Sequence, residues 1–214
     1  MKLSIPSTVM MCAEWWAFEI LSILAGILGV VELASQTINF NMIALLFMIP
    51  LGIQEATCAI IGNCIGANNV PLAKRFFSMI NKIITVAVLM ISVVTFVARE
   101  QITACFTGDP EVREMSERLI MVTAFMIIFD GAQGYLQGPI RALGLQQRAS
   151  YFAITSYWVI AIPISLIFSF WLEIGVIGLS FGISLGVFFQ FCLLLLILLR
   201  QNRQDISDKA AERI

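Results

Sequence analysis

Acidic side chains stand inside apolar stretches of this 214-residue sequence, where a charge is costly. Glu14 and Glu19 lie within MMCAEWWAFEILSILAGIL (residues 10–28), and Asp130 lies within VTAFMIIFDG. A carboxylate in hydrocarbon, with no cation beside it, binds a proton more readily than in water, because desolvation disfavours its charged form. We therefore predict that Glu14 or Glu19, together with Asp130, exchanges a proton for a cation. The alternative is a protonated acid that holds a neighbouring helix through a hydrogen bond.

Helical spacing separates some of these residues and aligns others. Glu14 and Glu19 differ by about 140° around a helix axis, so they cannot face the same point. Asp130, Gln133 and Gln137 recur at i, i+3 and i+7 and form one polar stripe. Aromatic faces such as that of Trp15 can hold organic cations, although tryptophan is also ordinary membrane packing. The candidates for a substrate cavity are Trp15, Asn39, Asn41, Gln54, Glu55, Gln133 and Gln137.

The composition indicates a membrane protein. Hydrophobic residues make up 59% of the chain and charged residues 13%, well below the charged share of a soluble domain. A membrane-crossing helix needs roughly 20 mostly apolar residues, and the alternation typical of barrel strands is not visible. The sequence therefore predicts an all-α polytopic membrane protein with six transmembrane helices, at residues 5–29, 37–61, 76–98, 115–137, 150–171 and 175–199.

Basic residues predict the orientation of these spans, because cytoplasmic segments carry an excess of Lys and Arg. Six spans place both ends of the chain on one side, which then holds ten basic residues against three on the other. Both termini are therefore expected to be cytoplasmic, with a six-helix lobe over residues 1–200 and a polar cytoplasmic tail over 201–214. The ten are Lys2, Lys74, Arg75, Lys82, Arg141, Arg148, Arg200, Arg203, Lys209 and Arg213, and the three are Arg99, Arg113 and Arg118.

Helix-breaking residues occur within the predicted spans. Pro50 lies in the second span, Pro163 lies in the fifth, and GVIGLSFGISLGV opens the sixth with four glycines. Small residues allow close helix packing in membranes. The two prolines are also candidates for hinges in a conformational cycle, and the pattern leaves both interpretations open.

Several classes of function are disfavoured by the residue types present. Histidine is absent, so neither a Ser-His-Asp arrangement nor a His-ligated metal site is possible. The five cysteines form no CxxC pair, which favours free thiols that pack as small apolar groups. No basic stripe suited to nucleic acid is visible. We therefore expect no enzymatic activity, no metal, no cofactor and no nucleic-acid partner.

Several motifs occur in an order that resembles a known family. They are CAEWWAFEIL, LLFMIPLGI, IGNCIGANNVPLAKR, FDGAQGYLQGPIRALGLQQRASY and YWVIAIPISLIF. Together they resemble the multidrug and toxic compound extrusion (MATE) family, most closely its eukaryotic branch, over nearly the whole chain. The resemblance implies one lobe of a twelve-helix transporter, the C-terminal six helices. It also implies a cation-coupling site at Glu14, Glu19 and Asp130.

The resemblance implies a function as an antiporter, or half of one. It would export drugs or organic cations in exchange for protons, rather than sodium, by alternating access within the lipid bilayer. The lobe would need the missing N-terminal lobe, another half, or a second copy as a homodimer. The alternative is a non-transporting truncated protein or scaffold that keeps only the lobe fold.

Overall fold

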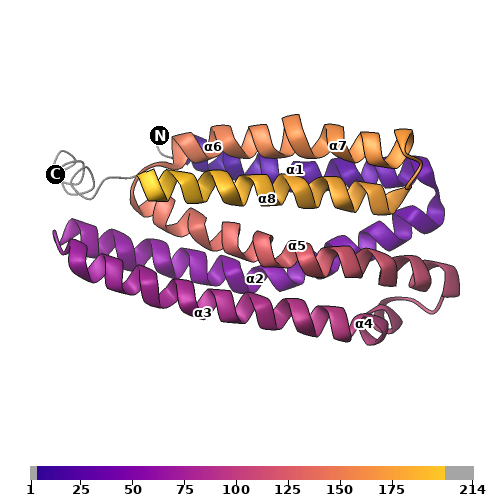
Figure 1. The fold of residues 1–214 in the computed structure, drawn as a ribbon, viewed down its shortest axis with the longest axis horizontal. Coiled ribbons are helices and arrows are strands. Elements are labelled where there is room, and N and C mark those ends of the chain that lie inside the picture. The colour runs from indigo at the N-terminus through magenta and orange to yellow at the C-terminus, as the bar shows by residue number, and fades with distance from the viewer. Residues whose placement is uncertain (1–3, 201–214) are drawn as a thin grey trace.

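Long helices make up the computed structural model, which describes residues 4–200 (Figure 1). The predicted tail, 201–214, lies outside the described residues. The elements, in chain order, are α1 (Ser4–Leu28), α2 (Val30–Gly66), α3 (Val70–Val97), α4 (Arg99–Phe106), α5 (Pro110–Ala142), α6 (Gln146–Ile154), the π-helical segment η1 (Thr155–Ala161), α7 (Ile162–Leu166), the π-helical segment η2 (Ile167–Trp171) and α8 (Val176–Arg200).

Six of the described helical stretches are long and apolar enough to cross a membrane, which confirms the predicted six spans. Three of the predicted spans were too short, and the third begins at Val70 rather than at residue 76. The second span is the 37-residue α2, and the fourth is the 33-residue α5. Hydropathy locates the apolar centre of such a helix but not its polar ends. The connection after the third span also contains α4, a short helix that lies between two of the predicted spans.

The helices form two groups of three spans. One group is α2, α3 and α5, and the other is α1, α8 and the continuous fifth span from α6 to η2. Contacts of α5 with α8, and of α1 with α2, join the groups. Ser4 and Arg200 lie at the same end of the bundle, as an even number of crossings requires (Figure 1). The interior of α5 is the most enclosed of the spans, so polar residues on it are held among other helices.

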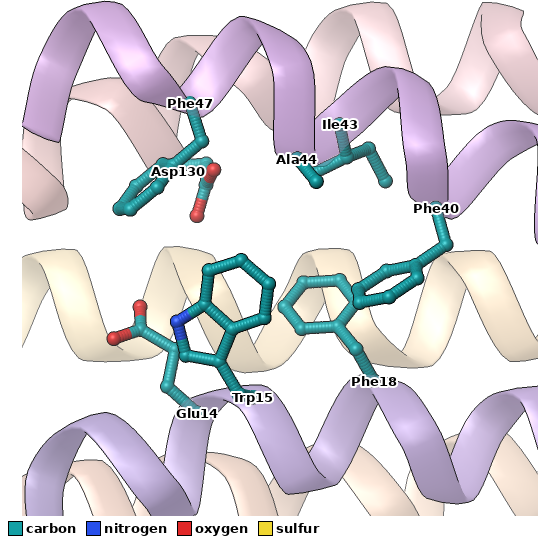
Figure 2. A pocket seen from close by; sticks show the side chains of 8 residues that line it. All are labelled: Glu14, Trp15, Phe18, Phe40, Ile43, Ala44, Phe47 and Asp130. Carbon is teal, nitrogen blue, oxygen red and sulfur yellow. The ribbon is translucent and has the colours of Figure 1, made fainter.

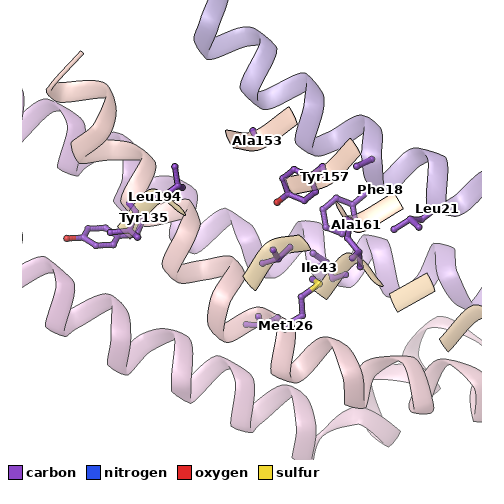
Figure 3. Packing of buried hydrophobic residues seen from close by; sticks show 14 of the residues in the cluster. Phe18, Leu21, Ile43, Met126, Tyr135, Ala153, Tyr157, Ala161 and Leu194 are labelled. Carbon is purple, nitrogen blue, oxygen red and sulfur yellow. The ribbon is translucent and has the colours of Figure 1, made fainter. Parts of the chain in front are cut away.

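Aliphatic and aromatic side chains from all of the spans fill the bundle. Figure 3 shows part of this packing, including Phe18, Met126 and Leu194. Leu21, Leu119 and Tyr157 are among the fully buried side chains. In a bilayer this packing is the main source of helix association, because lipid tails are as apolar as the helix surfaces. The core therefore holds the helices through close contact rather than through exclusion of water.

Glycines allow two pairs of helices to approach closely. On α5, a methyl group added at Gly138 would lie 2.5 Å from the backbone oxygen of Gln54 in α2. On α8, one added at Gly182 would lie 2.4 Å from the backbone nitrogen of Ser165 in α7. Both separations are far below van der Waals contact. Three of the four glycines in the sixth-span pattern, Gly178, Gly182 and Gly186, therefore serve close packing, whereas Gly175 has a positive φ of 69° and open space around it.

Neither proline breaks its helix. Pro50 is buried inside the continuous α2, beside Gly131 of α5. Pro163 is exposed and follows η1, where the N–H of Ile162 donates to the backbone oxygen of Tyr157. Such π-turns often accompany functional residues in helices. The hinge roles of Pro50 and Pro163 stay predictions.

The N-terminus of α5 depends on one cap. Asp109 accepts hydrogen bonds from the backbone N–H groups of Glu111 (2.9 Å) and Val112 (3.4 Å). Pro110 occupies the first helical position, where its missing N–H costs nothing. We expect Asp109→Ala to lower the free energy of unfolding by about 1 kcal/mol, measured as thermal unfolding in detergent. Asp109→Asn keeps an acceptor oxygen and should restore most of the loss; equal losses in both variants would contradict this role.

Candidate functional site

Glu14 is buried on α1, with 7% of its surface exposed, and its carboxylate accepts from three side chains. Gln133 donates through Nε2 to Oε1, and Gln137 donates through Nε2 to Oε2 over 3.3 Å. The hydroxyl of Tyr157 donates to Oε1 over 3.0 Å. Both glutamines come from α5 and the tyrosine from η1, so three elements converge on one carboxylate.

Asp130 belongs to the same network. Its Oδ1 accepts from Nε2 of Gln133 over 3.2 Å, so a single amide nitrogen lies within hydrogen-bonding distance of both acids. Asp130 is also buried, with 5% of its surface exposed. The two carboxylates line a cavity of about 20 Å³ between α1 and α2 (Figure 2). Its remaining lining residues are Trp15, Phe18, Phe40, Ile43, Ala44 and Phe47.

A fourth element completes the network. Gln190 of α8 donates through Nε2 to Oε1 of Gln133 over 3.1 Å, and the same oxygen accepts from Gln137 over 3.1 Å. Oε1 of Gln190 is buried and has no hydrogen-bond partner within residues 4–200. Sequence reasoning missed Gln190 and Tyr157. A lone amide in the apolar run GVFFQFCLLLL was the signal that could have pointed to Gln190.

Neutral donors alone contact the two acids. Within the described part of the chain, no Lys or Arg forms an ion pair with Glu14 or Asp130. The donors around Glu14 suit a carboxylate, since they point at its acceptor oxygens. The three donors occupy three of the roughly four acceptor sites of the Glu14 carboxylate, so one site is left for a proton. A change of charge on Glu14 therefore acts directly on side chains of both α5 and η1.

The two glutamates of α1 point in different directions, as their spacing predicted. Glu19 is exposed on the helix surface, whereas Glu14 is buried in the network. The structure therefore brings together Glu14 and Asp130 and leaves Glu19 apart from them. Trp15 lines the cavity beside Glu14, and its ring meets that of Phe40 edge-on, with centroids 6.1 Å apart.

Gln133 and Gln137 belong to the network on the acids, whereas the four candidates on α2 do not line this cavity. Asn39 is buried and accepts from Thr123 of α5 over 2.9 Å, so it joins two helices. Asn41 is exposed and donates to the backbone oxygen of Thr37. None of the four amide and acidic candidates on α2, namely Asn39, Asn41, Gln54 and Glu55, lines the space between Glu14 and Asp130.

Gln54 and Glu55 both meet Arg141 near the end of α5. In the orientation that pairs its donors with acceptors, the Gln54 amide donates to the backbone oxygen of Gly134 and accepts from Arg141 over 3.0 Å. Glu55 is 58% exposed and forms an ion pair with Arg141 at 2.6 Å. The Arg141 side chain is only 17% exposed, so the pair is partly shielded from solvent. These two residues therefore bind one arginine rather than a substrate in this arrangement of the lobe.

Comparison with known proteins identifies relatives over most of the chain. Multidrug and toxin extrusion protein 1 of Mus musculus is 33% identical over 211 residues, which are 98% of this chain and 37% of that protein. The protein of the same name from Oryctolagus cuniculus is 31% identical over 182 residues, 85% of this chain and 32% of that protein. The chain thus spans about a third of the length of these curated relatives.

The fold leads to the same group. The crystal structure of the eukaryotic MATE transporter AtDTX14 superposes with a TM-score of 0.94 at 29% identity, over 99% of this chain and 48% of that chain. The MatE family model matches residues 6–167. That match extends over well more than half of the sequence and includes Glu14, Asp130 and Tyr157. The chain is therefore a member of the MatE family of integral membrane proteins.

Proposed function

We propose that this chain is one lobe of an antiporter that exports drugs or organic cations in exchange for protons by alternating access. The observation that carries the proposal is the buried pair of carboxylates, Glu14 and Asp130, joined through one amide of Gln133. Buried ionisable groups are expensive in a membrane and are typical of proton relays. The names of the relatives, multidrug and toxin extrusion proteins, support the substrate class.

The size of the site supports a need for a second lobe. A cavity of about 20 Å³ holds about one water molecule, far less than an organic cation. The substrate would therefore bind between this lobe and a partner. The N-terminal lobe is the first candidate, because the chain corresponds to 48% of the AtDTX14 chain. The other two candidates for the partner are another half-transporter and a second copy of this chain.

The geometry favours a proton over sodium as the coupling ion. Three of the roughly four acceptor sites of Glu14 already accept from Gln133, Gln137 and Tyr157, which leaves few oxygen ligands for a sodium ion. A proton needs only the one acceptor site that remains. The excess of basic residues at the end that holds Ser4 and Arg200 supports cytoplasmic termini, with residues 201–214 as a cytoplasmic tail.

Transport by vesicles tests the proposal. The chain is reconstituted into vesicles loaded with a cationic dye, alone and together with the N-terminal six-helix lobe of the mouse relative. We expect dye to leave the vesicles when the outside solution is made more acidic than the inside. Protons should enter the vesicles as the dye cations leave. Dye movement without a pH dependence would contradict proton coupling. No movement in either preparation would favour the alternative, a non-transporting lobe.

A further inference from the structure

A groove runs along the outside of the bundle, over α5 and between α3 and α8. Two cavities follow one another along it. The first, of about 310 Å³, lies near the end that holds the turn between α2 and α3. The second, of about 280 Å³, lies nearer the middle of the spans. Figure 1 shows α5 lying between α8 and α3 along this length. The groove is thus parallel to the helices and, in a bilayer, to the lipid chains.

Apolar side chains line both cavities. Pro139 and Leu143 of α5 lie at the first cavity, and Tyr135 and Leu136 lie at the second. The stacked rings of Phe77 and Tyr135, with centroids 5.9 Å apart, stand where one cavity follows the other. The hydroxyl of Tyr135 donates to the backbone oxygen of Phe77 over 3.2 Å, so it is not free to bind a ligand. The middle of the groove therefore offers mainly contact to hydrocarbon, with Asn81 and Thr85 as the polar residues of its lining.

One cation stands at the first cavity. Lys74 of α3 lines it and is exposed, and no acidic group within residues 4–200 forms an ion pair with it. Arg75, Arg141 and Arg148 lie at the same end of the bundle. Glu55, an acid at that end among the described residues, is already paired with Arg141. A ligand with an anionic head and a long apolar chain matches this distribution of charge and hydrocarbon.

We propose that this groove, which we call the α3–α8 groove, binds one anionic phospholipid. Its phosphate meets Lys74, and an acyl chain lies over Pro139 and past the Phe77–Tyr135 pair. A neutral lipid could fill the apolar part but would gain less from the lysine. The polar sequence that follows Arg200, QNRQDISDKAAERI, carries both signs of charge and suits water better than this groove. The proposal is independent of the transport mechanism.

Titration of lipid into the purified chain tests the site. The chain in neutral detergent is titrated with dioleoylphosphatidylglycerol or dioleoylphosphatidylcholine, and bound lipid is counted by native mass spectrometry. We expect one tightly bound phosphatidylglycerol, and weaker binding of phosphatidylcholine. Lys74→Gln should weaken phosphatidylglycerol binding about tenfold, since it removes one charge-assisted hydrogen bond.

The matched control is the neighbouring residue. Arg75→Gln removes one positive charge at the same depth, but Arg75 does not line the groove, so binding should change by less than about twofold. Equal losses of phosphatidylglycerol binding in both variants would show that general surface charge causes the effect, and would contradict the proposed site. Binding of both lipids that is insensitive to Lys74→Gln would overturn it as well. Glu14→Gln should bind phosphatidylglycerol normally, which separates failure of this proposal from failure of the transport proposal.

Discussion

Replacing Glu14 by glutamine is expected to abolish proton-driven transport while the lobe stays folded. Glutamine has nearly the shape of glutamate and still accepts at one oxygen, so some of the bonds from Gln133, Gln137 and Tyr157 can remain. It cannot bind and release a proton. We expect the rate of pH-driven dye transport to fall on the order of a hundredfold or more, as is typical when a proton-transferring group is lost.

The measurement needs a protein whose fold is verified and a control that removes an unrelated acid. Glu114→Gln removes an exposed acid of α5 whose partner is Arg118, so transport should keep its normal rate. Asp130→Asn should resemble Glu14→Gln, because both acids meet the same amide of Gln133. Normal coupled transport in both Glu14→Gln and Asp130→Asn would remove this network from the mechanism.

The variant Glu19→Gln tests whether an acid outside the buried network takes part in transport. Glu19 is exposed on α1 and does not line the cavity between Glu14 and Asp130. If its replacement stops transport, the reason must lie on the surface that it shares with a partner lobe or a substrate, and not in the buried network. Coupling stoichiometry distinguishes these cases: a lost coupling acid changes protons moved per dye, whereas a lost contact residue changes the dye concentration at half-maximal rate.

Replacing Gly182 by leucine is expected to prevent the lobe from folding normally. A methyl group at this position would already lie 2.2 Å from Oγ of Ser165 and 2.5 Å from its Cα. Those atoms include backbone of α7, so a rotamer change alone cannot relieve the contact and α7 and α8 must separate. We expect a loss of at least about 3 kcal/mol in the free energy of unfolding, the upper part of the range for overpacked cores.

Thermal unfolding and size-exclusion chromatography in detergent measure this effect. Gly52→Leu is the matched control, because Gly52 is exposed on α2 and no atom would lie within 4 Å of an added methyl group. That variant should unfold within a few degrees of the unaltered chain and run as a single species. Similar unfolding temperatures for Gly182→Leu and Gly52→Leu would show that the small-residue contact between α7 and α8 contributes little.

Local sequence patterns alone determined the number of spans and identified the acidic residues that lie inside them. The apolar stretches predicted six crossings, which the structure confirms. The angle between Glu14 and Glu19 predicted that they diverge, and the spacing of Gln133 and Gln137 placed both on one face of a helix. These properties depend on 1.5 Å of rise and 100° of turn per residue, which every helix shares. Such local rules apply wherever the chain is helical, whatever lies beside it.

Only the tertiary structure decided which polar residues meet. Gln133 lies 119 positions after Glu14, and Tyr157 lies 143 after it, yet both contact the same carboxylate. Asn39, by contrast, pairs with Thr123 and stays away from the acids. The side that a helix turns toward its neighbours depends on close contacts such as Gly138 against Gln54, which involve residues far apart in sequence. Helical periodicity says which residues share a face, but packing between distant segments determines what that face touches.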